Sequence, residues 1–220
     1  NRSRGLGDVY KRQFQYKGSP LKIDIKSGLF SAAGLGSSAA LSNSMGAALH
    51  QFTKPNEPLD LISLAKMGHS AEANAQKGRA SPTDTATSAL GGCIVVSGHK
   101  VRGTRHVFDA TLETPEGSRS WSVCEAKLPE IEDIWIVLGS TGIGSPTGKM
   151  VEGVSELIGK YPQKMDDIRA IGDITSSGLA SLSAGDMEGV GSAMSSCHER
   201  LRNLGVCLLY TSDAADDGHS

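Results

Sequence analysis

The most constraining feature of the sequence is a glycine loop that leads directly into a helix. The loop reads Ala33-Gly34-Leu35-Gly36-Ser37-Ser38-Ala39-Ala40, and apolar residues then recur at helical spacing to about Phe52. Glycines let the backbone turn sharply and approach a ligand closely. The free N–H groups and the dipole at the start of a helix favour phosphate, and a serine there can cap the helix or give an oxygen to Mg²⁺. Taken alone, the loop is compatible with a capped turn or with a phosphate site.

Two common phosphate-binding patterns do not fit this chain. Gly34, Gly36 and Ala39 satisfy the G-x-G-x-x-[GA] dinucleotide pattern, but the region about 20 residues further on should then hold a strand and an acidic residue. Residues 53–57 read instead as a loop between two helices. The G-x-x-x-x-G-K-[ST] pattern is approached at Gly148-Lys149, where both the first glycine and the final hydroxyl are missing.

Hydrophobic periodicity predicts a chain of mixed helices and strands, in the α+β class. Helices are expected at residues 37–52, 59–76, 83–90, 147–161, 165–184 and 186–204, and strands at residues 21–26, 93–97, 105–112, 121–127 and 134–138. A boundary at residues 128–133 separates a mixed half from a mainly helical half.

The two ends of the chain are predicted to be foreign to it. Residues 8–13 read DVYKRQ and residues 207–212 read CLLYTS, and one oligonucleotide read on opposite strands can encode both. The oligonucleotide resembles a transposon-type adapter used in DNA sequencing. We therefore expect residues 1–13 and 207–220 to be adapter artefacts, and residues 14–206 to be a natural fragment that is truncated at both ends.

Composition argues against several classes of protein. With 38% hydrophobic residues and a formal net charge of -2, neither global disorder nor a basic nucleic-acid-binding surface is indicated. No run of about 18 apolar residues occurs, so we expect no contact with a membrane. Cys93, Cys124 and Cys197 are few and widely spaced, which is typical of reduced thiols in a cytoplasmic protein.

A second polar stretch lies between the helix predicted at 59–76 and the strand predicted at 93–97. It has the spacing G-x-x-S-x-x-D-x-x-x-S, with Asp84 as its acidic residue, and it ends in Gly91-Gly92. An aspartate can accept or orient the proton of a hydroxyl that attacks a phosphate. Taken alone, the stretch favours Asp84 as an N-cap of a helix that begins at Thr85.

The glycine loop and the Asp84 motif together resemble the GHMP kinase superfamily, and the second motif is similar to that of the mevalonate kinases. The proline usual just before the loop is absent, since Phe30 and Ser31 stand there. The resemblance implies a two-domain α+β fold, with an N-terminal part like domain 2 of ribosomal protein S5 and a helical, ferredoxin-like C-terminal part. It places an incomplete ATP-binding domain at residues 14–127 and an incomplete C-terminal domain at residues 128–206.

The same resemblance assigns roles to individual residues. The loop is expected to wrap the phosphates of ATP through Ala33, Gly34, Leu35, Gly36, Ser37, Ser38 and Ala39. Ser38 and Glu72 are expected to hold Mg²⁺, and Asp84 is expected to be the catalytic carboxylate. His50 and His69 are interpreted as ordinary helix residues. The loop at 139–149 either caps the next helix or faces the cleft between the domains.

The implied activity is the transfer of a phosphoryl group from ATP to the 5-hydroxyl of mevalonate in isoprenoid biosynthesis, nearer the archaeal type. Phosphomevalonate kinase, homoserine kinase, diphosphomevalonate decarboxylase and a non-catalytic nucleotide-binding protein stay open as alternatives. The N-terminal lysine motif and the C-terminal glycine-rich loop of the family are absent, so we expect little or no kinase activity from this chain alone. The expected partner is a small molecule, and the oligomeric state stays open, a homodimer included.

Overall fold

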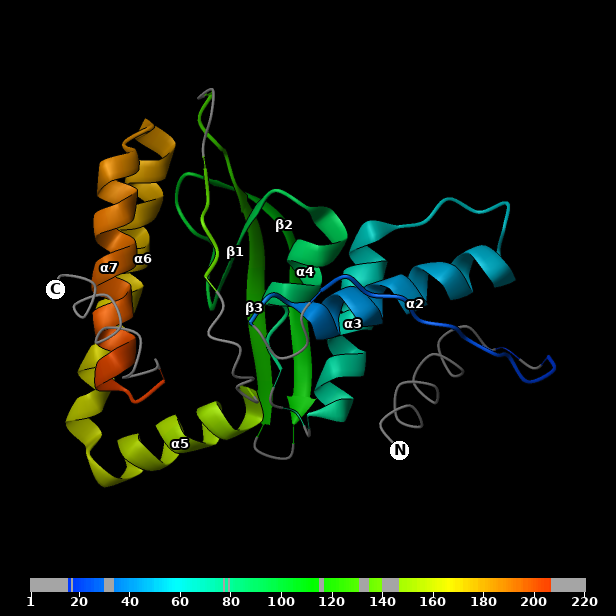
Figure 1. Cartoon of the computed structure of the whole chain (residues 1–220), viewed down its shortest axis with the longest axis horizontal. Coiled ribbons are helices and arrows are strands. Elements are labelled where there is room, and N and C mark those ends of the chain that lie inside the picture. The colour runs from blue at the N-terminus through cyan, green and yellow to red at the C-terminus, as the bar shows by residue number, and fades with distance from the viewer. Residues whose placement is uncertain are drawn as a thin grey trace, which may run out of the picture. The chain divides into compact units, whose positions relative to one another are not determined.

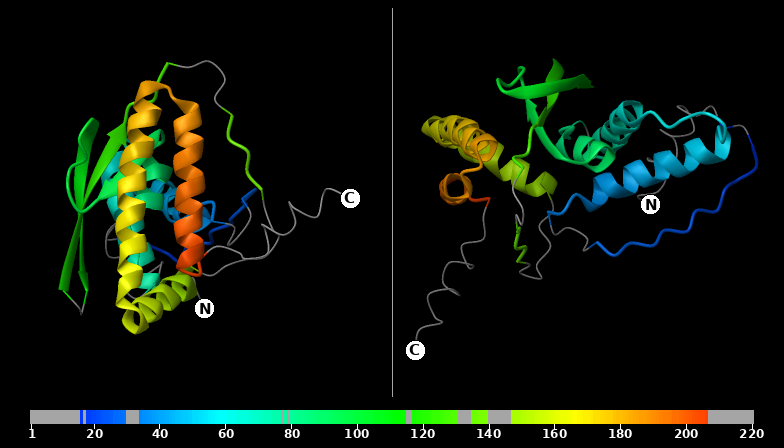
Figure 2. Two further views of the ribbon diagram at one scale, coloured as in Figure 1. Left: turned by 90° about the vertical axis from the view of Figure 1, so that its left-hand side faces the viewer. Right: turned by 90° about the horizontal axis from the view of Figure 1, so that it is seen from above.

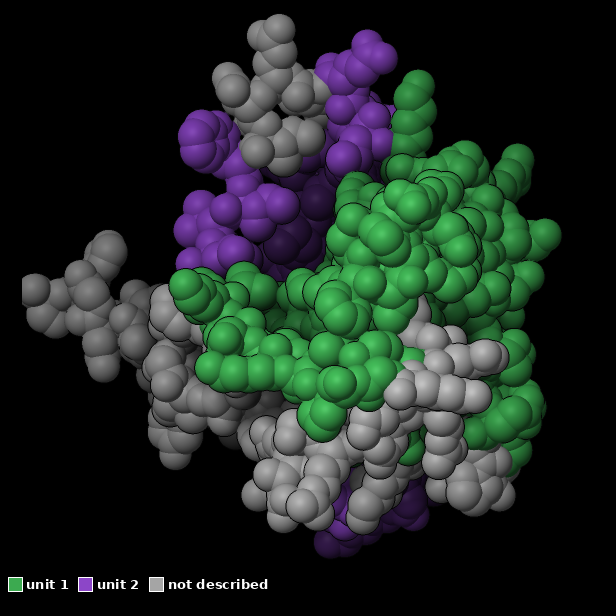
Figure 3. All heavy atoms as spheres, turned by 90° about the vertical axis from the view of Figure 1, so that its right-hand side faces the viewer, with its two compact units in different colours: residues 1–127 green, residues 128–220 purple. Residues whose placement is uncertain are grey.

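The structure is a computed structural model that describes residues 16, 18–29, 34–76, 78, 80–114, 117–130, 135–139 and 147–206. The chain divides into two units, residues 1–127 and residues 128–220 (Figure 3). The predicted adapter segments, 1–13 and 207–220, lie outside the described residues, as do residues 140–146 of the loop at 139–149.

In its described residues, the first unit has three helices followed by a small antiparallel sheet (Figure 1). Its elements are α2 (Ser37–Thr53), α3 (Leu61–Ala75), α4 (Thr83–Leu90), β1 (Cys93–Ser97), β2 (Thr104–Thr114) and β3 (Gly117–Ala126). The strand order is β1-β3-β2, and the β2–β3 hairpin pairs Thr104 with Ala126 at one end and Thr114 with Gly117 at the other. A bulge between His106 and Phe108 shifts this register.

The helices of the first unit lie on one side of its sheet (Figure 2). Helix α4 contacts β1, and α3 contacts β2, while α2 packs on α3 and α4. The core between helices and sheet is a cluster of small and aromatic side chains: Ala65, Ala86, Phe108, Ala110 and Val123. Such small residues let the helices approach the sheet and one another closely, which brings the ends of α2 and α4 together.

Helix α2 turns a face of small side chains toward α3 and α4. Its buried residues are Ala39, Ser42, Asn43 and Gly46, which recur every three or four positions. Helix α3 begins at a firm cap, because the Asp60 carboxylate accepts the backbone N–H groups of Ile62 at 3.1 Å and Ser63 at 3.2 Å. The small residues determine which side α2 buries, and the Asp60 cap determines where α3 starts.

The second unit is helical in its described part. It consists of α5 (Thr147–Lys160), the short 3-10 helix η1 (Pro162–Lys164), α6 (Met165–Ala184) and α7 (Met187–Asn203). Helices α6 and α7 form a pair, and the turn between them uses Gly185 at φ 76° and an Asp186 cap on Gly189 N–H at 2.9 Å. No described helix of either unit has the length and apolar character needed to cross a membrane.

Two predicted strands are wrong. The segment at 21–26 is irregular and exposed, with Ile23 at 49% and Ile25 at 58% of full exposure. Residues 135–138 of the second segment are equally irregular, and Val137 is 93% exposed, while Ile134 lies outside the described residues. A strand forms only where a neighbour completes its backbone hydrogen bonds, and among the described residues β1, β2 and β3 pair only with one another.

Candidate functional site

The glycine loop turns through two left-handed residues before α2. Gly34 has φ 71° and Gly36 has φ 65°, a region that residues with a Cβ adopt only at a cost. Gly36 is the N-cap of α2, so neither serine is the cap, and no side chain caps this end of the helix. Ala33, the first predicted loop residue, lies outside the described residues, and Leu35 is 40% exposed.

The first turn of α2 therefore has free backbone donors. The first helical hydrogen bond runs from Ala40 N–H to the Gly36 carbonyl at 2.9 Å. The N–H groups of Ser37, Ser38 and Ala39 precede it, and within the described part of the chain they have no acceptor. Three such amides at the positive end of a helix dipole suit an anion, and a phosphate group matches them well.

Asp84 lies beside this loop. It is in the first turn of α4, whose N-cap is Pro82, so the sequence-based alternative of Asp84 as an N-cap is wrong. A Cβ atom built on Gly36 would lie 3.8 Å from both Cβ and Cγ of Asp84. The exposed carboxylate of Asp84 thus sits against the turn that begins α2.

Glu72 connects the loop to Asp84 from the third helix. It lies on α3 and is only 6% exposed. Burial raises the pKa of the Glu72 carboxyl, a hydrogen bond from Ser38 opposes that rise, and the nearby charge of Asp84 adds to it. Ser38 from α2, Glu72 from α3 and Asp84 from α4 therefore converge on one site.

This site has the groups that a magnesium–nucleotide complex needs. Mg²⁺ is usually held by one or two carboxylates, with phosphate oxygens and water completing an octahedron. Glu72 and the Ser38 hydroxyl could supply protein oxygens to the cation. The N–H groups at the start of α2 could donate hydrogen bonds to a phosphate beside it. A bound cation would also favour the ionised form of Glu72, which burial disfavours.

His50 and His69, interpreted from the sequence as ordinary helix residues, each lie within hydrogen-bond distance of a backbone carbonyl. His69 is 3% exposed, its Nε2 lies 3.2 Å from the Ala80 carbonyl oxygen, and its ring meets Trp121 edge-on at 5.5 Å. Burial lowers the pKa of His69, so the ring is neutral near pH 7. His50 Nε2 lies 3.0 Å from the Glu57 carbonyl oxygen, between α2 and the loop that follows it.

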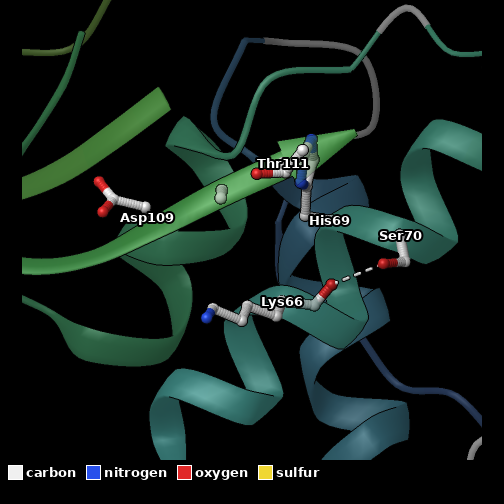
Figure 4. Close-up of a pocket in the computed structure, with 6 residues that line it drawn as sticks. Lys66, His69, Ser70, Asp109 and Thr111 are labelled. Atoms are coloured by element: carbon white, nitrogen blue, oxygen red, sulfur yellow. Dashed lines mark hydrogen bonds between the residues drawn. The ribbon is translucent and has the colours of Figure 1, made fainter. Parts of the chain in front are cut away.

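A shallow pocket of about 330 Å³ lies between α3 and β2 (Figure 4). It was missed from the sequence because its residues come from two distant segments. Its lining is polar and consists of Lys66, His69, Ser70, Asp109, Ala110 and Thr111. Asp109 is held there by the Ser122 hydroxyl at 2.7 Å and His106 Nε2 at 3.0 Å.

Comparison with known proteins points to one superfamily. Residues 4–92 match the family model described as GHMP kinases N terminal domain. The chain is 27% identical over 208 residues to the mevalonate kinase of Methanothermobacter thermautotrophicus, a match that covers 93% of this chain and 59% of that protein. No solved structure matches the chain. Because the family match begins at residue 4, the adapter origin of residues 4–13 stays a prediction.

Proposed function

Since this chain belongs to the GHMP kinase superfamily and is mevalonate kinase-like in sequence, we propose that it is part of an enzyme that transfers the γ-phosphoryl group of ATP to the 5-hydroxyl of mevalonate. The chain spans 59% of the length of the mevalonate kinase that it matches, and we take residues 14–206 as the central part of such an enzyme. In this proposal, residues 14–127 form the ATP-binding domain and residues 128–206 the C-terminal domain, and the enzyme acts in the cytoplasm.

One observation carries the proposal. Three helices that are separate in sequence bring Ser38, Glu72 and Asp84 to the glycine turn at the start of α2. A phosphate-binding turn alone would support any nucleotide-binding protein. A buried glutamate and an exposed aspartate beside that turn add the oxygens for a cation and a group for a substrate hydroxyl.

The residues divide the chemistry among them. The amides of Ser37, Ser38 and Ala39 would bind phosphate oxygens, and Ser38 with Glu72 would hold Mg²⁺. When bound, Mg²⁺ neutralises the charge that develops on the phosphate oxygens. Asp84 orients the attacking hydroxyl and accepts its proton as the oxygen bonds to the γ-phosphorus, while the bond to the β-phosphate oxygen breaks and ADP leaves.

Other members of the superfamily remain alternatives for the substrate. Phosphomevalonate kinase, homoserine kinase and diphosphomevalonate decarboxylase would share the same nucleotide site. A nucleotide-binding protein without transfer activity would share the α2 turn without any need for Asp84. The 27% identity to a mevalonate kinase favours mevalonate among these substrates.

The test uses a completed enzyme, because we expect residues 14–206 alone to have little turnover. The missing flanks are supplied by the Methanothermobacter mevalonate kinase, and ADP release is measured with mevalonate, phosphomevalonate, homoserine and diphosphomevalonate in parallel. The proposal expects ADP release with mevalonate alone. Release with another of these substrates would assign the chain to that relative.

The variant Asp84→Asn separates a kinase from a binding protein. In the completed enzyme it should lower turnover by roughly 10²- to 10⁴-fold while ATP still binds, because the amide cannot accept the proton. Asp166→Asn, on exposed helix α6, is the matched control and should leave turnover unchanged. Equal turnover of the Asp84→Asn and wild-type enzymes would exclude the catalytic role.

A further inference from the structure

Asn43 links the helix that carries Ser38 to the helix that carries Asp84. It lies on α2, is 4% exposed, and donates a hydrogen bond from Nδ2 to the Thr85 carbonyl oxygen at 2.8 Å. Thr85 directly follows Asp84 and is itself fully buried. The side chain of Asn43 is thus hydrogen-bonded to the first turn of α4, next to the site.

The other half of the Asn43 amide is fixed by a close approach to α3. Its Oδ1 is buried and has no hydrogen-bond partner among the described residues. A Cβ atom at Gly68 would lie 2.2 Å from this Oδ1, so only glycine leaves room for it. Only the NH₂ group of the amide can donate to the Thr85 carbonyl, which sets the amide orientation and turns Oδ1 toward Gly68.

Packing alone does not account for an asparagine here. An apolar side chain at position 43 would avoid burying an unsatisfied oxygen, which destabilises a fold. The rest of this face of α2 is small, with Ala39 and Gly46 buried beside it. An amide at this place has one property that an apolar residue lacks, namely a directed bond to the α4 backbone.

We propose that Asn43 is a positioning residue, which sets the place of Asp84 relative to Ser38 and Glu72 through its hydrogen bond to the Thr85 carbonyl. This role rests on the proposed function of the site. Asn43 touches neither nucleotide nor metal in this account. It acts on Asp84 through the backbone of α4, and a misplacement of about 1 Å at a catalytic group can cost roughly 10²-fold in rate.

A double variant separates positioning from packing. Asn43→Ala removes both the hydrogen bond and the atoms that crowd Gly68. Adding Gly68→Ala places a methyl group in the space that Oδ1 leaves, at a tight 3.3 Å from Thr85 Cγ2, and it replaces a helical glycine by a better helix former. The double variant N43A/G68A therefore refills the interface without restoring the bond to Thr85.

The experiment measures turnover of the completed enzyme with ATP, Mg²⁺ and mevalonate, together with ATP binding by calorimetry and thermal unfolding. Asn74→Ala, at an exposed asparagine of α3, is the control. We expect turnover to fall roughly 10-fold or more in both N43A and N43A/G68A, while ATP affinity stays near that of the wild type. The midpoint of thermal unfolding should fall in N43A and recover in N43A/G68A, while N74A should behave as wild type.

The results have distinct meanings. Wild-type turnover in N43A, or its recovery in N43A/G68A along with stability, would overturn the positioning role and leave the proposed function intact. If N43A does not fold, the double variant decides alone. A wild-type chain that binds no ATP with Mg²⁺ would overturn the proposed function, and the role of Asn43 would fall with it.

Discussion

The Cβ position of Gly36 lies 3.8 Å from Cβ and Cγ of Asp84, so the turn that begins α2 is packed against the carboxylate-bearing turn of α4. The two residues belong to separate motifs of the sequence, and the α2–α4 contact is what joins them. A phosphate bound to the α2 amides would therefore lie close to a carboxylate that can handle a hydroxyl proton.

Gly36→Ala should damage the loop through its backbone. The new methyl group would meet Asp84 at an ordinary contact distance, so the cost comes from φ 65°, about 1–2 kcal/mol for a residue with a Cβ. We expect ATP affinity to fall at least about tenfold, because the strained turn redirects the amides that follow it. Calorimetry and urea unfolding measure the two effects. Gly28→Ala is the control, because a Cβ atom added there has nothing within 4 Å. Unchanged ATP affinity in Gly36→Ala would contradict the role of the turn.

Glu72→Gln should stabilise the metal-free protein at neutral pH. Burial raises the pKa of Glu72 above its ordinary value of 4.5, so the folded state binds the proton more tightly than the unfolded chain. Stability is therefore lost as the pH rises from about 4.5 through the raised pKa, and glutamine avoids this loss. Thermal unfolding in EDTA should show the gain at pH 7 and none below pH 4.5.

Glu57→Gln is the control of opposite sign for this prediction. A hydrogen bond and the charge of Lys54 hold the pKa of the exposed Glu57 below 4.5. The Glu57–Lys54 pair therefore adds a little to the free energy of unfolding above pH 4.5, and the variant removes it. Glu57→Gln should not be more stable than the wild type at pH 7. If Glu72→Gln is less stable than wild type at pH 7 in EDTA, the burial of an ionisable Glu72 is contradicted.

Asp60→Ala should cost about 1 kcal/mol of folding free energy, because it removes the cap of α3. Asp60→Asn keeps an acceptor and should lose only a fraction of that. Hydrogen bonding from Ser63 lowers the pKa of Asp60 below 3.8, so the charge-dependent part of the cap is present above that pH and is lost as the pH falls through the lowered value. Urea unfolding at pH 7 and pH 2 should show the difference between Asp60→Ala and wild type shrinking in acid. A difference that stays constant with pH would argue against an ionised cap.

Asp167→Asn should loosen the α6–α7 pair of the second unit. Its carboxylate accepts from Arg200 Nη1 at 3.2 Å and Asn203 Nδ2 at 3.4 Å, and Lys164 Nζ lies at 3.6 Å. Burial acts to raise the pKa of Asp167, but these partners outweigh it and hold the pKa below 3.8, so their stabilisation is lost as the pH falls through that lowered value. Hydrogen exchange of α6 and α7 amides at pH 7 should accelerate.

The neighbouring Asp166 gives a matched control for Asp167. It pairs with Arg169 at 2.8 Å, but both side chains are more than 70% exposed, at 74% and 72%. Exposed pairs of this kind contribute little to stability. Asp166→Asn should therefore leave exchange in α6 and α7 nearly unchanged, and an effect equal to that of Asp167→Asn would contradict a special role for Asp167.

The structure confirms several elements that were predicted from local signals. The helix at 83–90, the strand at 93–97 and the helix at 165–184 form with the predicted ends, since glycines or proline bound them and periodicity fills them. The alternating segment at 21–26 has equally good local signals and forms no strand. A strand depends on a partner elsewhere in the chain, which a local pattern does not reveal.

In the candidate site, too, local sequence signals predicted some features, and others became visible only in the structure. The sequence identified the glycine turn, and resemblance supplied Glu72 and Asp84 as its companions, which the structure places beside it. The true cap of α2 was missed, because Ser37 and Ser38 are better capping residues than Gly36 and only the backbone angle of Gly36 decides between them. The bond from Asn43 to Thr85 has no sequence signal, since it depends on how α2 crosses α4.

The most direct measurement of the central claim is calorimetric titration of the wild-type chain with ATP, in Mg²⁺ and in EDTA. If the α2 amides bind phosphate and Ser38 and Glu72 hold a cation beside them, ATP should bind saturably at one site per chain. The affinity should be at least about tenfold lower in EDTA, because the cation that Ser38 and Glu72 would hold is then absent. A tenfold loss of affinity corresponds to roughly 1.4 kcal/mol of binding free energy. The absence of saturable binding in Mg²⁺, or equal affinity in both buffers, would contradict the account.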